Sequence, residues 1–437
     1  VERRLRERWW AEAGEKVDSP LRRVLFVSVE KIQGGRERIP ESWAVHGTTG
    51  YRFANAVGGI FVNPAAEGPM TDTYHRFIGE ALDFEEMVYE KKRLILRDFM
   101  SSELNVLAYR LNRISELNRR TRDFTLNSLR RALAEFVALF PVYRTYVDDE
   151  HASVDERDVR YIQDTLRLAK ARNATLNVSI FDFLGDVLLR HYPEHLGEAE
   201  RAEMLAFVMK VQQVTGPVMA KGLEDTTFYI YNRMSALNEV GGEPEHFGTS
   251  AAVFHERNHE RALHWPASML TSSTHDTKRS EDVRARLHVL SELPEAWRER
   301  VEHWSSLTRA LRTEMPAGPA PSLNDEYLFY QTVVGAWPMG GALPAAGLEE
   351  LRGRIREYML KAIKEAKVRT SWTNPDKDYE EGVARFVDAC LGEAQGKAFI
   401  EDVQVFKRRI ERAGQHNALG QTLLKVMSPG VVDTYQG

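Results

Sequence analysis

The chain has 437 residues and a formal net charge of −5, with 43% hydrophobic and 28% charged residues. Because the charge is mildly negative and the lysines and arginines are interspersed with acids, we expect neither nucleic acid nor an anionic membrane as a partner. No apolar run approaches the roughly 18 residues that cross a bilayer. These properties are typical of a soluble globular protein, and the length suits a barrel with an insertion.

The cysteine content and the two ends indicate the context of the chain. The single cysteine, Cys390, cannot form an internal disulfide, which fits a reducing, cytoplasmic compartment. Its apolar surroundings in residues 384–391 favour buried packing over a role as nucleophile. The sequence begins at Val1 with a charged stretch that lacks a signal-peptide core, and it stops abruptly at Gly437. We therefore expect an internal piece of a longer protein.

The first predicted elements are a helix and a strand. Residues 1–18 have the pattern of an amphipathic helix, which Pro20 ends. Residues 25–29 form a nearly continuous apolar, β-branched run, which predicts a strand buried on both faces of a parallel sheet. Glu30 follows at the carboxyl end of that strand. A polar loop with two glycines then covers residues 46–51.

A helical block is predicted over residues 72–215. Apolar residues recur there every three or four positions, as in residues 104–117, which is the spacing of one helix face. Residues 216–290 are predicted to be mainly loops, with a short strand at 269–273. Further helices and a last strand are expected at residues 281–313, 347–368, 394–413, 421–427 and 431–434.

Glu30 is the first candidate for chemistry. A carboxylate at the end of a buried strand lies at a partly desolvated rim, which favours its protonated form. A protonated carboxyl is what a general acid needs in order to act on a glycosidic oxygen. A structural salt bridge to Lys31 or Arg36 remains an open alternative.

His275 and Asp276 follow the strand predicted at residues 269–273. At the rim of a barrel, where active-site side chains gather, this pair could orient a sugar hydroxyl and stabilise positive charge at an anomeric carbon. The alternative is helix capping, because Asp276 or Thr277 suits the N-cap of the following helix and Glu281 would complete a capping-box variant.

Two polar loops are candidates for ligand binding. Residues 219–226 contain Lys221, Glu224 and Asp225, and residues 237–242 place an amide and a carboxylate beside two glycines. Clustered charged and amide side chains suit a polyhydroxylated ligand. An ordinary solvated loop fits the same composition.

Residues 255–259 match the H-E-x-x-H pattern, in which two histidines one helical turn apart share a zinc ion. Glu281 would then be a third ligand beside His255 and His259, and the protein a zinc peptidase. The charged flanks and the nearby Pro266 favour a polar surface helix, so we expect no metal. The sequence contains no glycine motif for phosphate or dinucleotide binding, so we expect no cofactor.

Several segments together resemble the maltooligosyl trehalose synthases, which belong to the α-amylase superfamily, glycoside hydrolase family 13. The most specific segment is residues 273–286, which contains His275 and Asp276. The other segments follow the family order over nearly the whole chain, at residues 29–32, 41–51, 140–146, 219–226, 237–244 and 428–437.

The resemblance implies a fold and a reaction. The fold is α/β, a partial (β/α)8 barrel with the later strands only and a large, mostly α-helical insertion. Residues 1–71 would carry the acid/base strand, 72–215 the helical insertion, and 216–437 the rest of the insertion and the returning barrel segment. The reaction is an intramolecular transglycosylation that converts the reducing-end α-1,4 bond of a maltooligosaccharide into an α,α-1,1 bond.

The resemblance also implies roles for single residues. Glu30 matches the general acid/base and Asp276 the transition-state-stabilising carboxylate, with His275 on the same sugar. The nucleophilic Asp of the family lies on the strand before that of Glu30, and no matching segment precedes Leu21 in this sequence. We therefore expect the chain alone to be inactive without the missing N-terminal half of the barrel. Substrate contacts are expected from His46, Tyr51, Lys221, Glu224, Asp225, Lys278 and Arg279.

Two further functions remain open at this point. The chain could be a non-catalytic glucan-binding half-barrel that a partner chain completes, or part of an amylase-like α-glucan hydrolase. A nucleophilic Asp encoded upstream in frame would favour an enzyme over the binding module.

Overall fold

The computed structural model describes residues 4, 7, 8, 11, 25–35, 37–151 and 153–435. The helix predicted for residues 1–18 lies mostly outside this set. No helix of the described part is both long and apolar enough to span a membrane.

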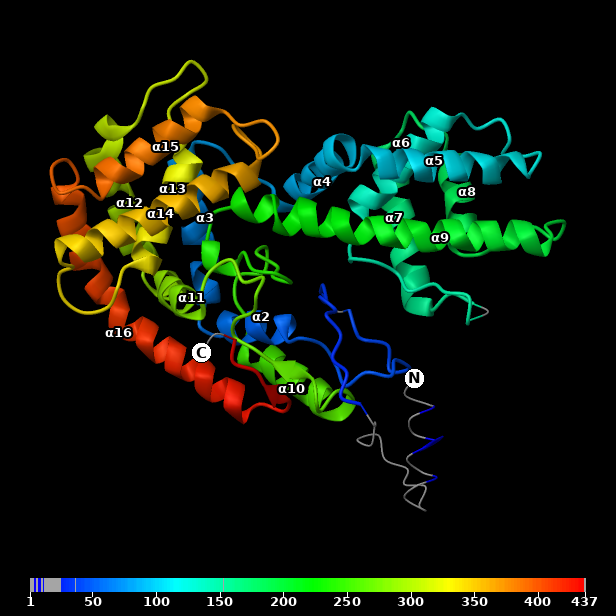
Figure 1. The fold of residues 1–437 in the computed structure, drawn as a ribbon, viewed down its shortest axis with the longest axis horizontal. Helices are drawn as coiled ribbons and strands as arrows, with labels where there is room; N and C mark the ends of the chain where they lie inside the picture. The colour runs from blue at the N-terminus through cyan, green and yellow to red at the C-terminus, as the bar shows by residue number, and fades with distance from the viewer. Residues whose placement is uncertain are drawn as a thin grey trace. The chain divides into compact units, whose positions relative to one another are not determined.

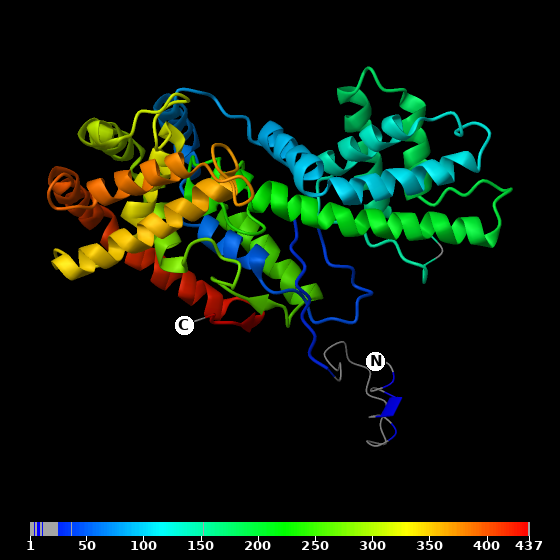
Figure 2. The same cartoon turned by 45° about the horizontal axis from the view of Figure 1, so that its top comes forward.

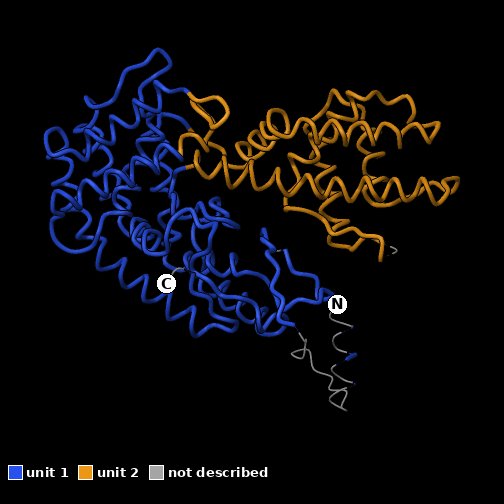
Figure 3. Tube along the Cα trace, viewed as in Figure 1, with its two compact units in different colours: residues 1–80, 232–361, 376–437 blue, residues 81–231, 362–375 orange. Residues whose placement is uncertain are grey.

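The chain divides into two compact units (Figure 3). Unit 1 combines three stretches of the sequence, and unit 2 combines two. The domain boundaries expected after residues 71 and 215 stay a prediction. The units comprise residues 1–80, 232–361 and 376–437 in unit 1, and residues 81–231 and 362–375 in unit 2.

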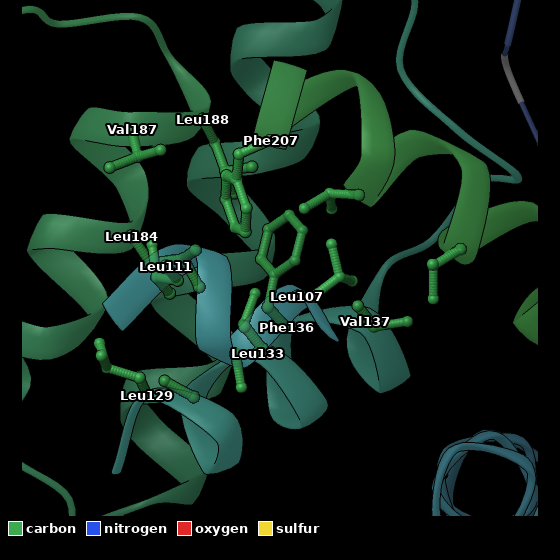
Figure 4. Packing of buried hydrophobic residues seen from close by; sticks show 14 of the residues in the cluster. Leu107, Leu111, Leu129, Leu133, Phe136, Val137, Leu184, Val187, Leu188 and Phe207 are labelled. Carbon is green, nitrogen blue, oxygen red and sulfur yellow. The ribbon is translucent and has the colours of Figure 1, made fainter. Parts of the chain in front are cut away.

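Unit 2 is a helical bundle, as predicted for most of its residues (Figure 1). Leu107 and Leu111 of one helix meet Leu133, Phe136 and Phe207 of two others in a continuous apolar core (Figure 4). This packing explains the spacing of apolar residues in the sequence, because each helix buries one face. The helices are α4 (Phe84–Leu94), α5 (Ser101–Glu116), α6 (Leu126–Leu139), α7 (Glu156–Arg172), α8 (Val178–Leu188) and α9 (Glu198–Met219), with π-helical turns η2 (Ile95–Phe99) and η3 (Ala220–Glu224) and the 3₁₀ turn η4 (Thr227–Tyr229).

Unit 1 contains most of the remaining helices, and α14 (Ala345–Ala366) begins in it. Its largest buried side chains form an aromatic core around Trp297, Trp304 and Tyr330, against which Phe399 and Phe406 pack. Figure 2 shows α16 as the long red helix that runs through this unit. The other helices are α2 (Tyr51–Gly59), α3 (Glu67–Ile78), α10 (Ala251–His264), α11 (Glu281–His288), α12 (Pro294–Thr308), α13 (Leu323–Ala336), α15 (Lys377–Cys390) and α16 (Lys397–Met427), with 3₁₀ turns η1 (Pro64–Ala66), η5 (Ser235–Leu237), η6 (Val289–Glu292) and η7 (Arg309–Leu311).

The sequence prediction missed or divided several of these helices. The region expected to be mainly loops at 216–290 contains α10. Helix α13 lies between the helices expected at 281–313 and 347–368, where no element was predicted. Helix α13 is buried on nearly all sides, so it shows no amphipathic period. The two helices expected at 394–413 and 421–427 are one helix, α16. Its Gly414 lies so close to Arg286 that a Cβ there would be only 2.6 Å from it, so the glycine serves close packing and does not end the helix.

Four short backbone segments run side by side in unit 1. Strands β1 (Met269–Leu270) and β2 (Val431–Val432) pair in parallel, and Val29 forms a parallel bridge to Thr48. The amide of Met269 donates to the carbonyl of Thr48 over 3.1 Å, which joins the two pairs. The segments are thus linked in chain order, and the short strands predicted near 269 and 431 are confirmed.

The strand predicted at residues 25–29 was wrong in its extent and burial. Only Val29 forms a bridge, and the side chains of Leu25 and Phe26 are 42% and 56% exposed. The segment still pairs with its neighbour, because the amide of His46 donates to the carbonyl of Val27 over 2.7 Å. A run of apolar residues predicts an extended conformation, but burial on both faces also needs covering elements.

Candidate active site

Glu30 is held in place by its neighbours along the chain. The amide of Val29 donates to the carbonyl of Gly47, and the hydroxyl of Thr48 both accepts from the amide of Lys31 and donates to its carbonyl. The buried Lys31 forms its ion pair with Glu37 at 2.7 Å and not with Glu30. The alternative of a salt bridge from Glu30 to Lys31 was therefore wrong, and Arg36 lies outside the described residues.

Two glycines explain the polar loop at residues 46–51. Gly47 has φ +136°, and a Cβ on it would be 2.5 Å from Ser268. Gly50 has φ +87°, and its Cβ would be 2.8 Å from the carbonyl oxygen of Met269. Only glycine combines this backbone conformation with such a close approach to the next segment. The loop then enters helix α2, whose first residue is Tyr51.

Tyr51 joins the two candidate carboxylates. Its hydroxyl lies 2.7 Å from Oε1 of Glu30 and 3.1 Å from Oδ2 of Asp276. Burial, with the hydrogen bond to Glu30 next in size, raises the pKa of Tyr51 above its usual range, so the phenol stays protonated and can donate. Tyr51 and Asp276, which are 225 positions apart in the sequence, are thus in direct contact.

His275 completes this group. Its Nε2 lies 3.7 Å from Oε1 of Glu30 and 3.5 Å from Oδ2 of Asp276. The side chains of Glu30, Asp276 and His275 are 48%, 47% and 61% exposed, so all three can be reached by a ligand. Tyr51 beneath them is buried. The arrangement presents two acids and an imidazole above a buried donor, which suits a polyhydroxylated substrate.

The loop that carries His275 and Asp276 is held from below by Glu239. The carboxylate of this buried residue accepts hydrogen bonds from the amides of Lys278 and Arg279, at 2.7 and 2.9 Å. Burial raises the pKa of Glu239, while Arg284 and Arg279 oppose that effect. Helix α11 begins only at Glu281, with Ser280 as its N-cap. Helix capping by Asp276 or Thr277 was therefore the wrong alternative.

The other predicted contact residues divide between the units. Lys278 lies two positions after Asp276 in the same loop, and His46 forms hydrogen bonds with Val27, on the segment that ends at Glu30. The buried Arg279 donates to the hydroxyl of Tyr358 over 2.7 Å. Unit 2 contains Lys221, Glu224 and Asp225. There the ammonium of Lys221 pairs with Asp225 at 2.6 Å, and Glu224 is buried.

The H-E-x-x-H pattern lies on α10. His255 and His259 are exposed on that helix, and in the described part of the chain they do not form a three-ligand group with Glu281. The group of acid and histidine side chains whose ligand atoms lie within 4.8 Å of one another is Glu30, His275 and Asp276. The polar surface helix is the better interpretation of residues 255–259.

Curated relatives extend over most of the chain. Proteins of two Mycobacterium tuberculosis strains, named maltooligosyl trehalose synthase, are 32% identical to it over 413 residues. The match covers 94% of this chain and 48% of each relative, so the chain spans about half the length of the curated relatives it matches. No protein-family model matches the sequence.

Solved structures give the same result. The maltooligosyltrehalose synthase of Arthrobacter ramosus has a TM-score of 0.77 and 32% identity, over 100% of this chain and 48% of that one. A Sulfolobus tokodaii structure, described as a hypothetical maltooligosyl trehalose synthase, has a TM-score of 0.72 and 28% identity, over 100% of this chain and 50% of that one. The chain is homologous to one part of the maltooligosyl trehalose synthases. The resemblance found in its sequence is confirmed.

Two features of this site were missed in the sequence. Tyr51 was predicted to contact substrate, but its hydrogen bonds to both acids were not foreseen. Glu239 was placed in a ligand-binding loop, whereas it is buried beneath the loop of Asp276. The sequence feature that could have indicated this role of Tyr51 is its position directly after Gly50. The sequence indicated Glu239 only as part of a polar loop and not its role under the loop of Asp276, because its hydrogen bonds there are to backbone amides.

Proposed function

We propose that the chain is the part of a maltooligosyl trehalose synthase that carries the general acid/base and the transition-state-stabilising carboxylate. The main support is the Tyr51 hydroxyl, which joins Glu30 and Asp276 beyond the carboxyl ends of two parallel segments. Homology over 94% of the chain supports the same assignment. The substrate is then a maltooligosaccharide, and the reaction moves its reducing-end glucose from an α-1,4 to an α,α-1,1 linkage.

Each residue has a separate part in this reaction. Glu30 gives its proton to the glycosidic oxygen as the α-1,4 bond breaks, and a carboxylate nucleophile takes the glycosyl group. The released glucose turns, its anomeric hydroxyl attacks the glycosyl carbon, and Glu30 accepts the proton of that hydroxyl. Asp276 stabilises the positive charge at the anomeric carbon, and His275 binds a hydroxyl of the same sugar.

The nucleophile lies outside residues 1–437 in this proposal. We infer that the four linked segments are later strands of a (β/α)8 barrel, whose carboxyl ends carry the active site, and that unit 2 is a helical insertion. The other half of the enzyme then supplies the remaining strands and the nucleophilic Asp. A cytoplasmic location is part of the proposal, and the free cysteine Cys390 supports it.

The test uses the product of the complete reading frame that contains this chain. It is incubated with maltohexaose, and reducing ends and free glucose are followed together. A fall in reducing ends with little free glucose supports the transferase. Rising glucose would point to an amylase-like hydrolase, and no change in either would favour the glucan-binding module.

Two variants connect this result to the site. Glu30→Gln and Asp276→Asn keep the shape of the side chains but remove the acid or the charge, so conversion should fall about a hundredfold to ten-thousandfold. Glu256→Gln is the matched control, because Glu256 is an exposed carboxylate on α10 of the same unit. Wild-type conversion by Glu30→Gln would overturn the proposal, and loss of conversion in Glu256→Gln would point back to the zinc interpretation.

A further inference from the structure

Unit 2 contains a large cavity whose charge differs from that of the whole chain. The cavity has a volume of about 810 Å³, and its lining residues belong to α4, η2, α5, α6 and the end of α7. Six cationic and three acidic side chains line it, a net charge of +3, whereas the chain carries −5. A local excess of cations on an acidic chain indicates a site that attracts anions.

The acidic side chains of the cavity are mostly engaged in holding its walls. Both carboxylate oxygens of Glu86 lie 2.7 Å from the guanidinium of Arg172, which also covers the ring of Tyr89 at 4.1 Å. The buried Glu135 accepts from the hydroxyl of Tyr89 over 2.7 Å and from the amide of Asn173 over 3.0 Å. Glu135 also pairs with Arg93 at 3.5 Å, so these two carboxylates neutralise Arg172 and Arg93 and leave the other four cations of the cavity.

Two cations of the cavity remain available for a ligand. Lys91 is half-buried and Arg131 is exposed, and among the described residues neither makes a hydrogen bond or a close ion pair, while the exposed carboxylate of Glu90 acts on Lys91 only through its charge. Burial lowers the pKa of Lys91, which reflects the cost of keeping its charge partly desolvated. An anion in the cavity would offset this cost and would give both side chains a partner.

We propose that this cavity binds a phosphorylated small molecule. A phosphate group offers three acceptor oxygens and close to two negative charges, which suits guanidinium and ammonium donors that approach from several sides. The volume lies within the usual range of small-molecule sites and exceeds what one phosphate needs. Leu94 and Leu104 also line the cavity and would contact the organic part of the ligand.

This site is independent of the proposed glucan chemistry. The binding experiment therefore gives its result whether or not the proposed function is correct. The full-length enzyme is titrated calorimetrically, in metal-free buffer and without glucan, with inorganic pyrophosphate and with adenosine diphosphate. We expect saturable binding with a Kd below about 1 mM. Binding should weaken as sodium chloride is raised, because exposed charges are screened.

Variants locate the binding. Lys91→Gln and Arg131→Gln should each weaken it about tenfold or more, since each loses a hydrogen bond to a charged group. Arg119→Gln is the control, because Arg119 is exposed in the same unit and does not line the cavity. No binding of either phosphate, or equal binding by all variants, would overturn the proposal. Binding of an acidic peptide in place of both phosphates would also overturn it, in favour of a protein partner.

Discussion

The two units bury polar groups for different purposes. In unit 1, the buried carboxylate of Glu239 holds the loop that carries the exposed Asp276. In unit 2, the buried Asp158 and Lys92 bond to nearby backbone groups, the amide of Tyr146 and the carbonyl of Phe140, beside a continuous apolar core. We conclude that unit 2 is stabilised by packing, with its buried charges bonded to nearby backbone. In unit 1, the buried charge of Glu239 sets the geometry of the candidate site.

The largest expected effect comes from the apolar core of unit 2. Phe207→Ala removes a fully buried ring and should cost about 3–5 kcal/mol of the local free energy of unfolding. Hydrogen exchange of the full-length protein should then show lost protection in α5, α6 and α9, while β1 stays protected.

The matched change in unit 1 is Phe254→Ala. Phe254 belongs to a smaller core cluster with Phe53 and Leu270. Loss of protection should then be confined to α2, α10 and β1. An equal loss of hydrogen-exchange protection in both units from either substitution would mean that the units unfold together. That result would contradict separate stabilisation of the two units.

The next effect concerns the loop of Asp276. Glu239→Gln keeps the shape of the side chain but replaces a charged acceptor of two backbone amides, so the loop should shift. We expect kcat for trehalose-type product to fall about tenfold to a hundredfold, with little change in KM, as for misplaced catalytic groups. Restoration by Glu239→Asp is not expected, because a shorter side chain does not reach both amides.

Asp158→Asn is the control for this experiment. Asp158 is buried, its pKa is raised by burial, and it accepts from the amide of Tyr146 over 2.7 Å. It therefore matches Glu239 in chemistry but lies in the other unit. Asp158→Asn should change thermal stability and leave kcat unaltered. A loss of kcat in Asp158→Asn equal to that in Glu239→Gln would remove the distinction between the units.

The grouping of the site was largely predictable, because it depends on motifs with distinctive side chains. Glu30, His275 and Asp276 come together as the resemblance implied. The support for this group was not predictable. Glu239 bonds to backbone amides, which every sequence supplies, and the meeting of Tyr51 with Asp276 spans 225 positions. Long-range geometry of this kind leaves no local pattern.

The fold was predictable where one face of a helix is buried. The period in α5 correctly indicated a helix, because the opposite face meets water. The period fails for α13, which is buried nearly all round. The helices expected at 394–413 and 421–427 are the single helix α16, which continues through Gly414. Phe26 was predicted to lie in a strand buried on both faces, but its side chain is exposed. A run of apolar residues does not itself supply the elements that would cover it.

A pH effect should appear in unit 1 below neutrality. Burial, with Arg284 adding to it, lowers the pKa of His288 from 6.5 to about 3. Between these values the unfolded chain binds a proton that the folded chain does not, so stability falls as the pH falls. The loss should reach about 2 kcal/mol between pH 7 and pH 5.

His288→Phe is the variant that isolates this effect. It keeps a ring against Gly58 but cannot titrate, and the Nδ1 of His288 has no hydrogen-bond partner among the described residues to lose. Hydrogen exchange of α11, corrected for intrinsic rates, should show the acid-dependent loss in wild type and a flatter profile in the variant. An unchanged slope in His288→Phe would assign the effect to other groups.

The smallest effect is a second change of stability with pH, which should appear in unit 2 and above neutrality. Burial lowers the pKa of Lys92 from 10.5 to about 7. Between these values the unfolded chain holds a proton that the folded chain has lost, so the stability of unit 2 should rise with pH, by about 1.5 kcal/mol between pH 7 and 8.5. Lys92→Met should remove this rise from the exchange of α4 and leave the acid slope of α11 in place. Each titration would then be confined to the unit that buries the group, whereas a change in both slopes would show that the units share one unfolding equilibrium.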